Sequence, residues 1–257
     1  MDDTQAGQGT AAARPAGSPG TDAEALDLLA TGTLEVEGRL VAASNATMYC
    51  TVSTGDRQAA CVYKPVAGER PLWDFPTGTL AGREVSAYLV SVAAGWYLVP
   101  PTVFRDGPLG PGMCQLWIES DETADIMSLA RSSDHAALRQ MAVFDAVVNN
   151  ADRKIGHLLP DRDGRLYGCD HGVCFGEDYK LRTVLWQWRG QRLQAAAMEA
   201  LRTLQVALDS GSLSDDLGQW LSEAEVQATQ QRVDLLLRHR VHPYPPEDWP
   251  AVPWPPV

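Results

Sequence analysis

The hydrophobic pattern of the chain changes its period near the middle. Three segments between Leu34 and Lys64 are rich in β-branched and aromatic residues and are separated by turn-forming residues, which predicts strands. Apolar residues at helical spacing predict a helix at 79–93, and strands are expected again at 101–104 and 113–118. The second half predicts helices at about 134–150, 193–209 and 222–241, with a short hairpin at 158–169. We therefore expect an α+β fold of two lobes, a small antiparallel sheet with one helix followed by a mainly helical lobe, with a ligand cleft between them.

Both ends of the chain differ in composition from the region between them. Residues 1–22 contain almost no large apolar side chain, which predicts a disordered tail. Seven of the 17 prolines lie between Pro243 and Pro256, interleaved with Trp249 and Trp254, which predicts an extended arm packed along the body. The expected organisation is a tail at 1–22, a β-rich N-lobe at 23–119, a mainly helical C-lobe at 120–242 and a Pro/Trp-rich arm at 243–257.

Composition excludes several classes of protein. The chain has no run of 18 apolar residues, so a transmembrane helix is not expected. A net charge of −12 argues against binding to nucleic acid or to an anionic membrane, since both require clustered cations. The chain starts without an apolar targeting stretch, and its five cysteines are an odd number typical of reduced thiols. We expect a cytoplasmic protein.

Lysine is scarce in this chain. Of its 21 basic residues only Lys64, Lys154 and Lys180 are lysines, and the rest are arginines. Lysine and arginine differ in shape and hydration, so a lysine kept against this bias is a candidate for a role that arginine cannot fill. Lys180 and the nearby Arg182 follow the predicted hairpin, where they could meet a substrate, although a solvated surface charge is the more typical role for Lys180.

Four polar residues follow one another in the order that phosphoryl transfer requires. Lys64 ends a predicted strand, and Glu84 lies 20 residues later in the next helix. Asp152 follows an apolar helix, and Asp170 follows the hairpin 18 residues after it. Kinases use a strand lysine on the nucleotide phosphates, a helical glutamate that pairs with it, a catalytic-loop aspartate and a metal-binding aspartate. Each residue alone is typical of a solvated surface, but the order and spacing together predict a kinase-like site for ATP and Mg²⁺.

The fifth residue after Asp152 departs from this pattern. Protein kinases have a metal-binding asparagine there, and this chain has His157. Imidazole is a softer ligand than an amide oxygen and suits Mn²⁺ or Zn²⁺ better than Mg²⁺. Three interpretations stay open: His157 binds a metal other than Mg²⁺, it contacts a phosphate, or the chain binds nucleotide without turning it over.

Two segments also resemble a known family. Asn150–Lys154 and Cys169–Gly172 are similar to the catalytic and metal-binding segments of phosphatidylinositol 3- and 4-kinases. Residues 32–245 as a whole resemble a bacterial family that is distantly similar to those lipid kinases, on the stretches VYKPVAGERPLWD, GTLAGREVSAYLV and GW-LVPPT. The resemblance implies an atypical protein-kinase-like fold that uses ATP with Mg²⁺, and it does not imply a lipid substrate.

The resemblance also implies roles for individual residues. Lys64 would contact the nucleotide phosphates and be oriented by Glu84, Asp152 would position or deprotonate the acceptor hydroxyl, and Asp170 would ligate the metal, with His157 beside it. The residues expected to surround the nucleotide are Ser44, Asn45 and Thr47 over the phosphates and Gln115, Trp117 and Ile118 in the hinge near adenine.

Other functions remain as alternatives. The acidic chain favours a hydroxyl of a soluble small molecule or a protein as acceptor, so a protein partner is one option. A pseudokinase would bind nucleotide and release no product, and an AMP transferase would release pyrophosphate instead of ADP. A zinc site could be built from His157, Cys169, His171 and Cys174, but their spacing matches no familiar zinc pattern.

Overall fold

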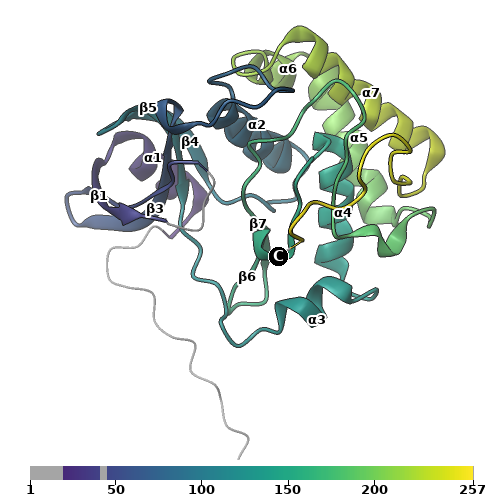
Figure 1. Cartoon of the computed structure of the whole chain (residues 1–257), viewed down its shortest axis with the longest axis horizontal. Coiled ribbons are helices and arrows are strands. Elements are labelled where there is room, and N and C mark those ends of the chain that lie inside the picture. The colour runs from purple at the N-terminus through teal and green to yellow at the C-terminus, as the bar shows by residue number, and fades with distance from the viewer. Residues whose placement is uncertain (1–19, 41–44, 257) are drawn as a thin grey trace, which may run out of the picture.

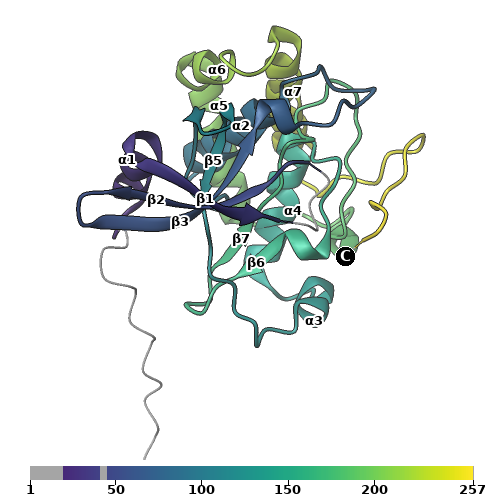
Figure 2. The ribbon, with the colours of Figure 1, turned by 60° about the vertical axis from the view of Figure 1, so that its left-hand side comes forward.

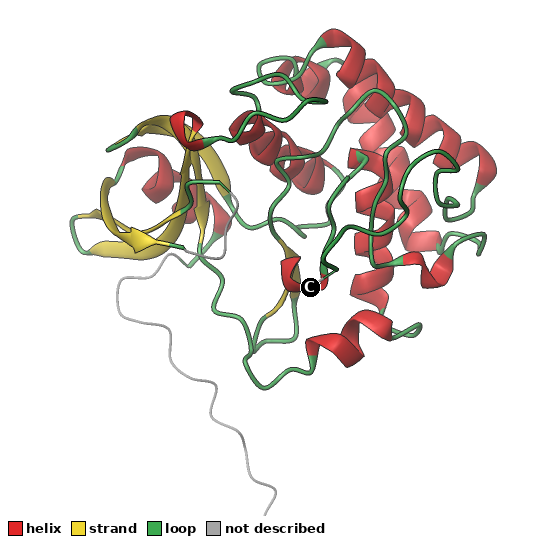
Figure 3. Cartoon of the chain, viewed as in Figure 1, coloured by secondary structure: helices red, strands yellow, loops and turns green. Residues whose placement is uncertain are grey.

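The computed structural model describes residues 20–40 and 45–256, and it has two lobes (Figure 1). Figure 3 shows that strands build one lobe and that helices dominate the other. The predicted α+β, two-lobed arrangement is confirmed. The predicted tail lies outside the described residues up to position 19. Within the described ranges, no helix combines the length and the apolar character that a membrane span requires.

The N-lobe is built on an antiparallel sheet of five strands in the order β1-β2-β3-β5-β4. The strands are β1 (Thr33–Arg39), β2 (Met48–Thr54), β3 (Arg57–Pro65), β4 (Thr102–Gly107) and β5 (Gly110–Leu116). Strands β4 and β5 reach further than the predicted strands at 101–104 and 113–118, because they already pair at Gly107 and Gly110. Gly110 has φ of 96°, a left-handed conformation that glycine adopts without strain, so the turn can be this tight.

A helix that the sequence did not predict covers one face of this sheet. Helix α1 (Asp22–Thr31) begins with a capping box, in which Thr21 and Glu24 each bond the backbone N–H of the other. Its Leu28 and Leu29 are fully buried against the sheet, in a cluster with Val52. The helix spans only ten residues, so tertiary packing rather than its own propensity stabilises it.

Helix α2 (Leu80–Ala93) lies between the sheet and the C-lobe, as Figures 1 and 2 show from two sides. It contacts β4 and β5 on one side and α4, α5 and α6 on the other. Its first turn is capped by Glu69, whose carboxylate accepts from the N–H groups of Leu80 and Ala81. A segment that precedes α2 in the chain therefore fixes its start.

The C-lobe contains the three long helices that the sequence predicted. They are α4 (Ala136–Val148), α5 (Ala195–Asp209) and α7 (Glu223–His239). The shorter α3 (Ile126–Arg131) precedes α4, and α6 (Ser212–Leu217) lies between α5 and α7. The expected hairpin is formed by β6 (Leu158–Pro160) and β7 (Leu166–Gly168). Short 3₁₀ turns occur at η1 (Val66–Gly68), η2 (Ile155–His157) and η3 (Trp186–Trp188). One hydrophobic core joins α2 to α4, α5 and α7, so the helix that carries Glu84 is packed into the C-lobe.

The C-terminal arm, residues 243–256, runs back over the C-lobe, and the chain ends near the β6–β7 hairpin (Figure 1). The carbonyl of Ala251 accepts from the backbone of Thr183 and from the indole N–H of Trp186. The carbonyl of Pro256 accepts from the N–H of Ile155, at 2.9 Å. The arm therefore touches the loop that carries Asp152.

Candidate active site

Three elements bring Lys64, Glu84 and Asp170 together in the cleft. Lys64 lies near the end of β3, Glu84 lies in the second turn of α2, and Asp170 follows β7. Lys64 Nζ is 2.6 Å from Glu84 Oε1 and 2.9 Å from Asp170 Oδ1. The Lys64 side chain is 19% exposed and that of Glu84 is 1% exposed, whereas that of Asp170 is 49% exposed. One buried and one accessible carboxylate thus hold the same ammonium group.

Charge explains why these groups stay ionised although they are partly buried. Burial by itself would lower the pKa of Lys64, but the carboxylates of Asp170 and Glu84 together outweigh it and raise that pKa. The ammonium of Lys64 in turn lowers the pKa of Asp170 well below its usual range. At neutral pH Asp170 is therefore an anion, as a metal ligand must be.

A buried network of hydrogen bonds and ion pairs holds the Glu84 carboxylate in position. Its Oε2 accepts from the backbone N–H of His171 at 2.8 Å, and His171 Nε2 lies 2.7 Å from Arg153 Nη2. Arg153 forms an ion pair with Asp145 of α4, 2.9 Å long and with both side chains fully buried. Arg83, the neighbour of Glu84, donates to Glu225 of α7 at 2.5 Å and so ties α2 to the C-lobe.

The structural role of the Asp145–Arg153 pair was not predicted from the sequence. One signal was present, because Asp145 is an acid in the middle of the otherwise apolar stretch Ala142–Val148. A charge in such a stretch indicates a buried partner.

Asp152 lies in the loop that follows α4. The helix ends at Asn149, whose backbone is left-handed at φ 52°, and the side chain of Asn150 accepts from the N–H of Asp152 at 2.9 Å. Lys154 Nζ is 3.1 Å from Asp152 Oδ2. Burial raises the pKa of Asp152, although the ammonium of Lys154 opposes the rise. Asp152 is thus a carboxylate with an adjacent cation and with more than ordinary basicity.

His157 lies beside Asp170, as its place in the sequence suggested. Its Nε2 is 3.4 Å from Asp170 Oδ2. Burial lowers the pKa of His157 to about 4, so the imidazole is neutral at pH 7 and a ring nitrogen is available for a metal. In the described residues, no three or more His, Cys, Asp or Glu side chains converge as a metal site. A cation held by Asp170 and His157 would therefore complete its shell with phosphate oxygens and water, as Mg²⁺ does at many nucleotide sites.

The same finding gives no support to the zinc alternative. His171 is engaged with Arg153, and burial raises the pKa of both Cys169 and Cys174, which keeps these thiols protonated.

The residues expected around the nucleotide have different placements. Ser44 lies outside the described residues. Asn45 uses its side-chain oxygen to accept from the N–H of Arg70, and Thr47 is buried. The Asn45 oxygen is therefore already bonded, and the Thr47 side chain is not exposed. Contact between this loop and the phosphates stays a prediction, and it would be made by backbone N–H groups.

The predicted hinge begins later than expected. Gln115 belongs to β5, is buried and donates to Thr102 Oγ1 at 2.8 Å, so it is a residue of the sheet. The connection between the lobes starts after Leu116. Trp117 and Ile118 are half-buried there, and Trp117 packs edge-on against Tyr49 of β2 with 5.1 Å between ring centroids. A role of these two residues at adenine remains a prediction.

Lys180 is not the solvated surface charge that its sequence context suggested. Its side chain is only 15% exposed, and Nζ is 3.3 Å from Asp74 Oδ2. The ammonium lies 4.9 Å from the ring centroid of Trp73 and 5.1 Å from that of Trp249. We call these four residues the lysine clasp: Lys180, Asp74, Trp73 and Trp249. The clasp joins the segment before α2, the loop after Asp170 and the C-terminal arm. All three lysines of the chain are thus paired with carboxylates.

No family model matches the chain. The chain is 45% identical over 262 residues to protein Rv2133c of Mycobacterium tuberculosis, and the alignment covers 89% of this chain and 94% of the relative. It is 26% identical over 179 residues to phosphatidylinositol 4-kinase gamma 4 of Oryza sativa subsp. japonica, covering 56% of this chain and 31% of that protein.

Several solved kinase structures share the fold. The Golgi casein kinase with Mn and ADP bound has a TM-score of 0.58 at 13% identity, covering 85% of this chain and 75% of its own. Hydra Fam20 with sugar has a TM-score of 0.56 at 14% identity, with 86% and 89% covered. The Helicobacter pylori proinflammatory kinase CtkA has a TM-score of 0.52 at 12% identity, with 83% and 94% covered. The predicted two-lobed, kinase-like fold is therefore confirmed, whereas the phosphatidylinositol 3-/4-kinase-like subtype is not.

Proposed function

The chain belongs to the same family as protein Rv2133c of Mycobacterium tuberculosis, and we propose that it is an ATP-dependent phosphotransferase that acts on a hydroxyl group. The observation that carries the proposal is the position of Lys64 Nζ, between Glu84 Oε1 and Asp170 Oδ1. A lysine held in this way by the helix after its strand and by a metal-binding aspartate is the arrangement that kinases use on ATP phosphates. The 26% identity to a plant phosphatidylinositol 4-kinase supports the predicted distant relation to lipid kinases.

The chain's own residues divide the reaction between them. Lys64 would bind the nucleotide phosphates while Glu84 fixes its ammonium group. Asp152 would accept a hydrogen bond from the acceptor hydroxyl, whose oxygen attacks the γ-phosphorus as the bond to the β-phosphate oxygen breaks and ADP leaves. The hydroxyl proton would pass to Asp152, whose raised pKa suits it as a proton acceptor. Lys154, 3.1 Å from Asp152, would neutralise charge on the transferred group.

Asp170 and His157 would hold the divalent cation, which when bound neutralises charge on the β- and γ-phosphate oxygens. One carboxylate and one neutral imidazole favour Mn²⁺ over Mg²⁺ more than an aspartate–asparagine pair does. The Mn and ADP bound to the Golgi casein kinase support nucleotide and divalent-metal use in this fold.

Calorimetric titration with ATP tests the proposal, in Mg²⁺, in Mn²⁺ and in chelator, with ADP formation measured on the same samples. We expect metal-dependent binding by the wild type and by Asp152→Asn. Turnover should fall by about 10²- to 10⁴-fold in Asp152→Asn, which is the usual contribution of a general base. Asp163→Asn, in the exposed turn of the hairpin, is the matched control and should behave as wild type. Full turnover by Asp152→Asn, or no ATP binding in either metal, would overturn the assignment.

A further inference from the structure

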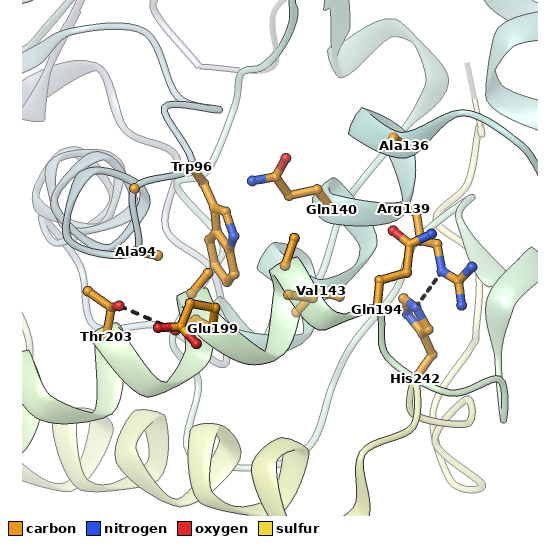
Figure 4. Close-up of a pocket in the computed structure, with 14 residues that line it drawn as sticks. Ala94, Trp96, Ala136, Arg139, Gln140, Val143, Gln194, Glu199, Thr203 and His242 are labelled. Atoms are coloured by element: carbon orange, nitrogen blue, oxygen red, sulfur yellow. Dashed lines mark hydrogen bonds between the residues drawn. The ribbon is translucent and has the colours of Figure 1, made fainter.

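Arg182 differs from the other arginines that are withdrawn from solvent. Its side chain is half-buried and makes no hydrogen bond or ion pair within residues 20–40 and 45–256. The other buried or half-buried arginines of these ranges all donate from the side chain to an acceptor, and they are Arg57, Arg83, Arg105, Arg139, Arg153 and Arg232. Arg139, for example, donates from Nε to His242 Nε2 at 3.2 Å (Figure 4). The guanidinium group of Arg182 is therefore unused.

The nitrogen atoms of this guanidinium group differ in accessibility. Nε of Arg182 is closed off from solvent and has no acceptor in the described part of the chain. Nη1 and Nη2 lack an acceptor there as well, but they are not closed off, so their four N–H groups can reach a ligand. A charge that is held partly out of water without a partner costs free energy. Such a cost is typical of a site whose partner arrives from solution.

Backbone hydrogen bonds place Arg182 beside the loop that carries Asp152. The N–H of Arg182 donates to the carbonyl of Asn150 at 2.9 Å, and its carbonyl accepts from the N–H of Arg153 at 3.0 Å. The next residue, Thr183, forms a parallel bridge with Arg153. The two segments therefore run side by side in an extended conformation.

The alternation of side chains along these segments directs Asp152 and Arg182 to the same face. Arg153 donates to Asp145 at 2.9 Å and Thr183 does so at 3.5 Å, so the two bridged residues both point inward to one buried carboxylate. Successive side chains of an extended segment point to opposite faces. Asp152 and Arg182, which precede the two inward residues, therefore both point outward.

Two further observations support this placement. Lys154, two residues after Asp152, pairs with it at 3.1 Å, as side chains on the same face of an extended segment can. Burial raises the pKa of Asp152, and the positive charge of Arg182 is among those that oppose the rise, so the guanidinium group acts on that carboxylate. The residue proposed to hold the acceptor hydroxyl thus has a neighbouring guanidinium group with accessible terminal nitrogens.

We propose that Arg182 determines which acceptors the site takes, by binding a carboxylate or phosphate group of the molecule whose hydroxyl lies at Asp152. A guanidinium group matches the oxygens of either anion through two parallel N–H bonds. Because Arg182 and Asp152 are neighbours, the anionic group and the hydroxyl belong to one small molecule, a hydroxy acid or a phosphorylated alcohol. The inference rests on the proposed function for the role of Asp152, whereas binding of the anion requires no turnover.

The Nε–H resonances of the arginines in ¹⁵N-labelled protein test the proposal at Arg182 itself. The Arg182 signal is assigned by its loss in Arg182→Lys. Glycerol 3-phosphate and glycerate are the probes and glycerol is their uncharged counterpart, and each is added with and without ADP and Mg²⁺. We expect a saturable shift of the Arg182 signal with at least one anionic probe and none with glycerol. The anionic probe that binds more tightly distinguishes phosphate from carboxylate.

Two results would overturn the proposal. One is that neither anionic probe shifts the signal beyond the shift seen in sodium chloride of equal ionic strength. The other is a shift that ADP and Mg²⁺ abolish, since Arg182 would then bind the nucleotide phosphates instead of the acceptor. ATP that stays unconverted while the probes still shift the Arg182 signal would contradict the proposed function and leave the anion site in place. The two failures are therefore distinguishable.

Three variants link probe binding to this side chain, and the backbone amide signal of residue 182 follows binding in each. Arg182→Gln should weaken probe binding at least tenfold. Arg182→Lys should recover part of the affinity, because it restores the charge without the paired N–H groups. Arg238→Gln, on the exposed face of α7, is the matched control and should bind as wild type. Unchanged binding by folded Arg182→Gln would contradict the assignment.

Discussion

Replacing Glu84 by glutamine should destabilise the protein by about 3 kcal/mol, because it removes the buried charge that holds Lys64. Two unit charges 2.6 Å apart attract by about 6 kcal/mol at an effective dielectric constant of about 20. Part of this is recovered, since Lys64 keeps Asp170 at 2.9 Å and the glutamine no longer buries a charge. The remainder corresponds to the lower end of the cost of breaking a buried ion pair, about 3–5 kcal/mol.

Thermal unfolding measures this loss. In a chain of 257 residues, about 3 kcal/mol corresponds to a decrease in Tm of about 6–12 °C. The control is Asp27→Asn, which breaks a pair of similar length, 2.8 Å to Arg57, whose side chains are 39% and 55% exposed. That pair should contribute less than about 1 kcal/mol. The reasoning is refuted if Glu84→Gln melts no lower than Asp27→Asn, or if a double-mutant cycle with Lys64→Met finds no coupling.

Three further predictions concern the metal, the lysine clasp and pH. His157→Asn should raise turnover in Mg²⁺ relative to Mn²⁺, because it supplies a hard oxygen ligand, and an unchanged ratio of rates would remove His157 from the metal site. Lys180→Met should leave Asp74 without its cation and speed hydrogen exchange in residues 70–79; exchange at the wild-type rate would show that the clasp does not restrain this segment. His157 and His242 have pKa values lowered to about 4, so the unfolded chain takes up protons from about pH 6.5 downward while the folded one does not. The free energy of unfolding should therefore fall between pH 7 and pH 5, by on the order of 2 kcal/mol per histidine. Denaturant unfolding that gives equal free energies at the two pH values would contradict the lowered pKa of both histidines.

Local pattern predicted much of the fold. The strands β1, β2 and β3 and the helices α2, α4, α5 and α7 follow from period and composition, which depend on neighbouring residues. The order of Lys64, Glu84 and Asp170 along the chain also predicted a cluster, because each follows an element whose place in a two-lobed fold is fixed. Their hydrogen bonds agree with that expectation, and their roles in phosphoryl transfer are the subject of the experiments above.

Contacts between distant residues could not be predicted in the same way. Lys180 lies 106 residues from Asp74 and finds Trp249 in the arm, and no local pattern relates these positions. Helix α1 forms because Leu28 and Leu29 pack under the sheet, which requires the sheet to exist first. Gln115 was placed in the hinge because the sequence does not mark where β5 ends, whereas its bond to Thr102 holds it in the sheet.

The measurement that tests the central claim most directly is ³¹P NMR of ATP after incubation with the protein in Mn²⁺ and in Mg²⁺, with the paramagnetic Mn²⁺ removed on a chelating resin before the spectrum is recorded. The proposed phosphotransferase converts ATP to ADP, with the γ-phosphoryl group appearing on an acceptor or as inorganic phosphate, and Asp170→Ala abolishes the conversion. Appearance of AMP and pyrophosphate would identify a nucleotidyltransferase instead. An unchanged ATP spectrum in both metals would contradict phosphoryl transfer by this cleft.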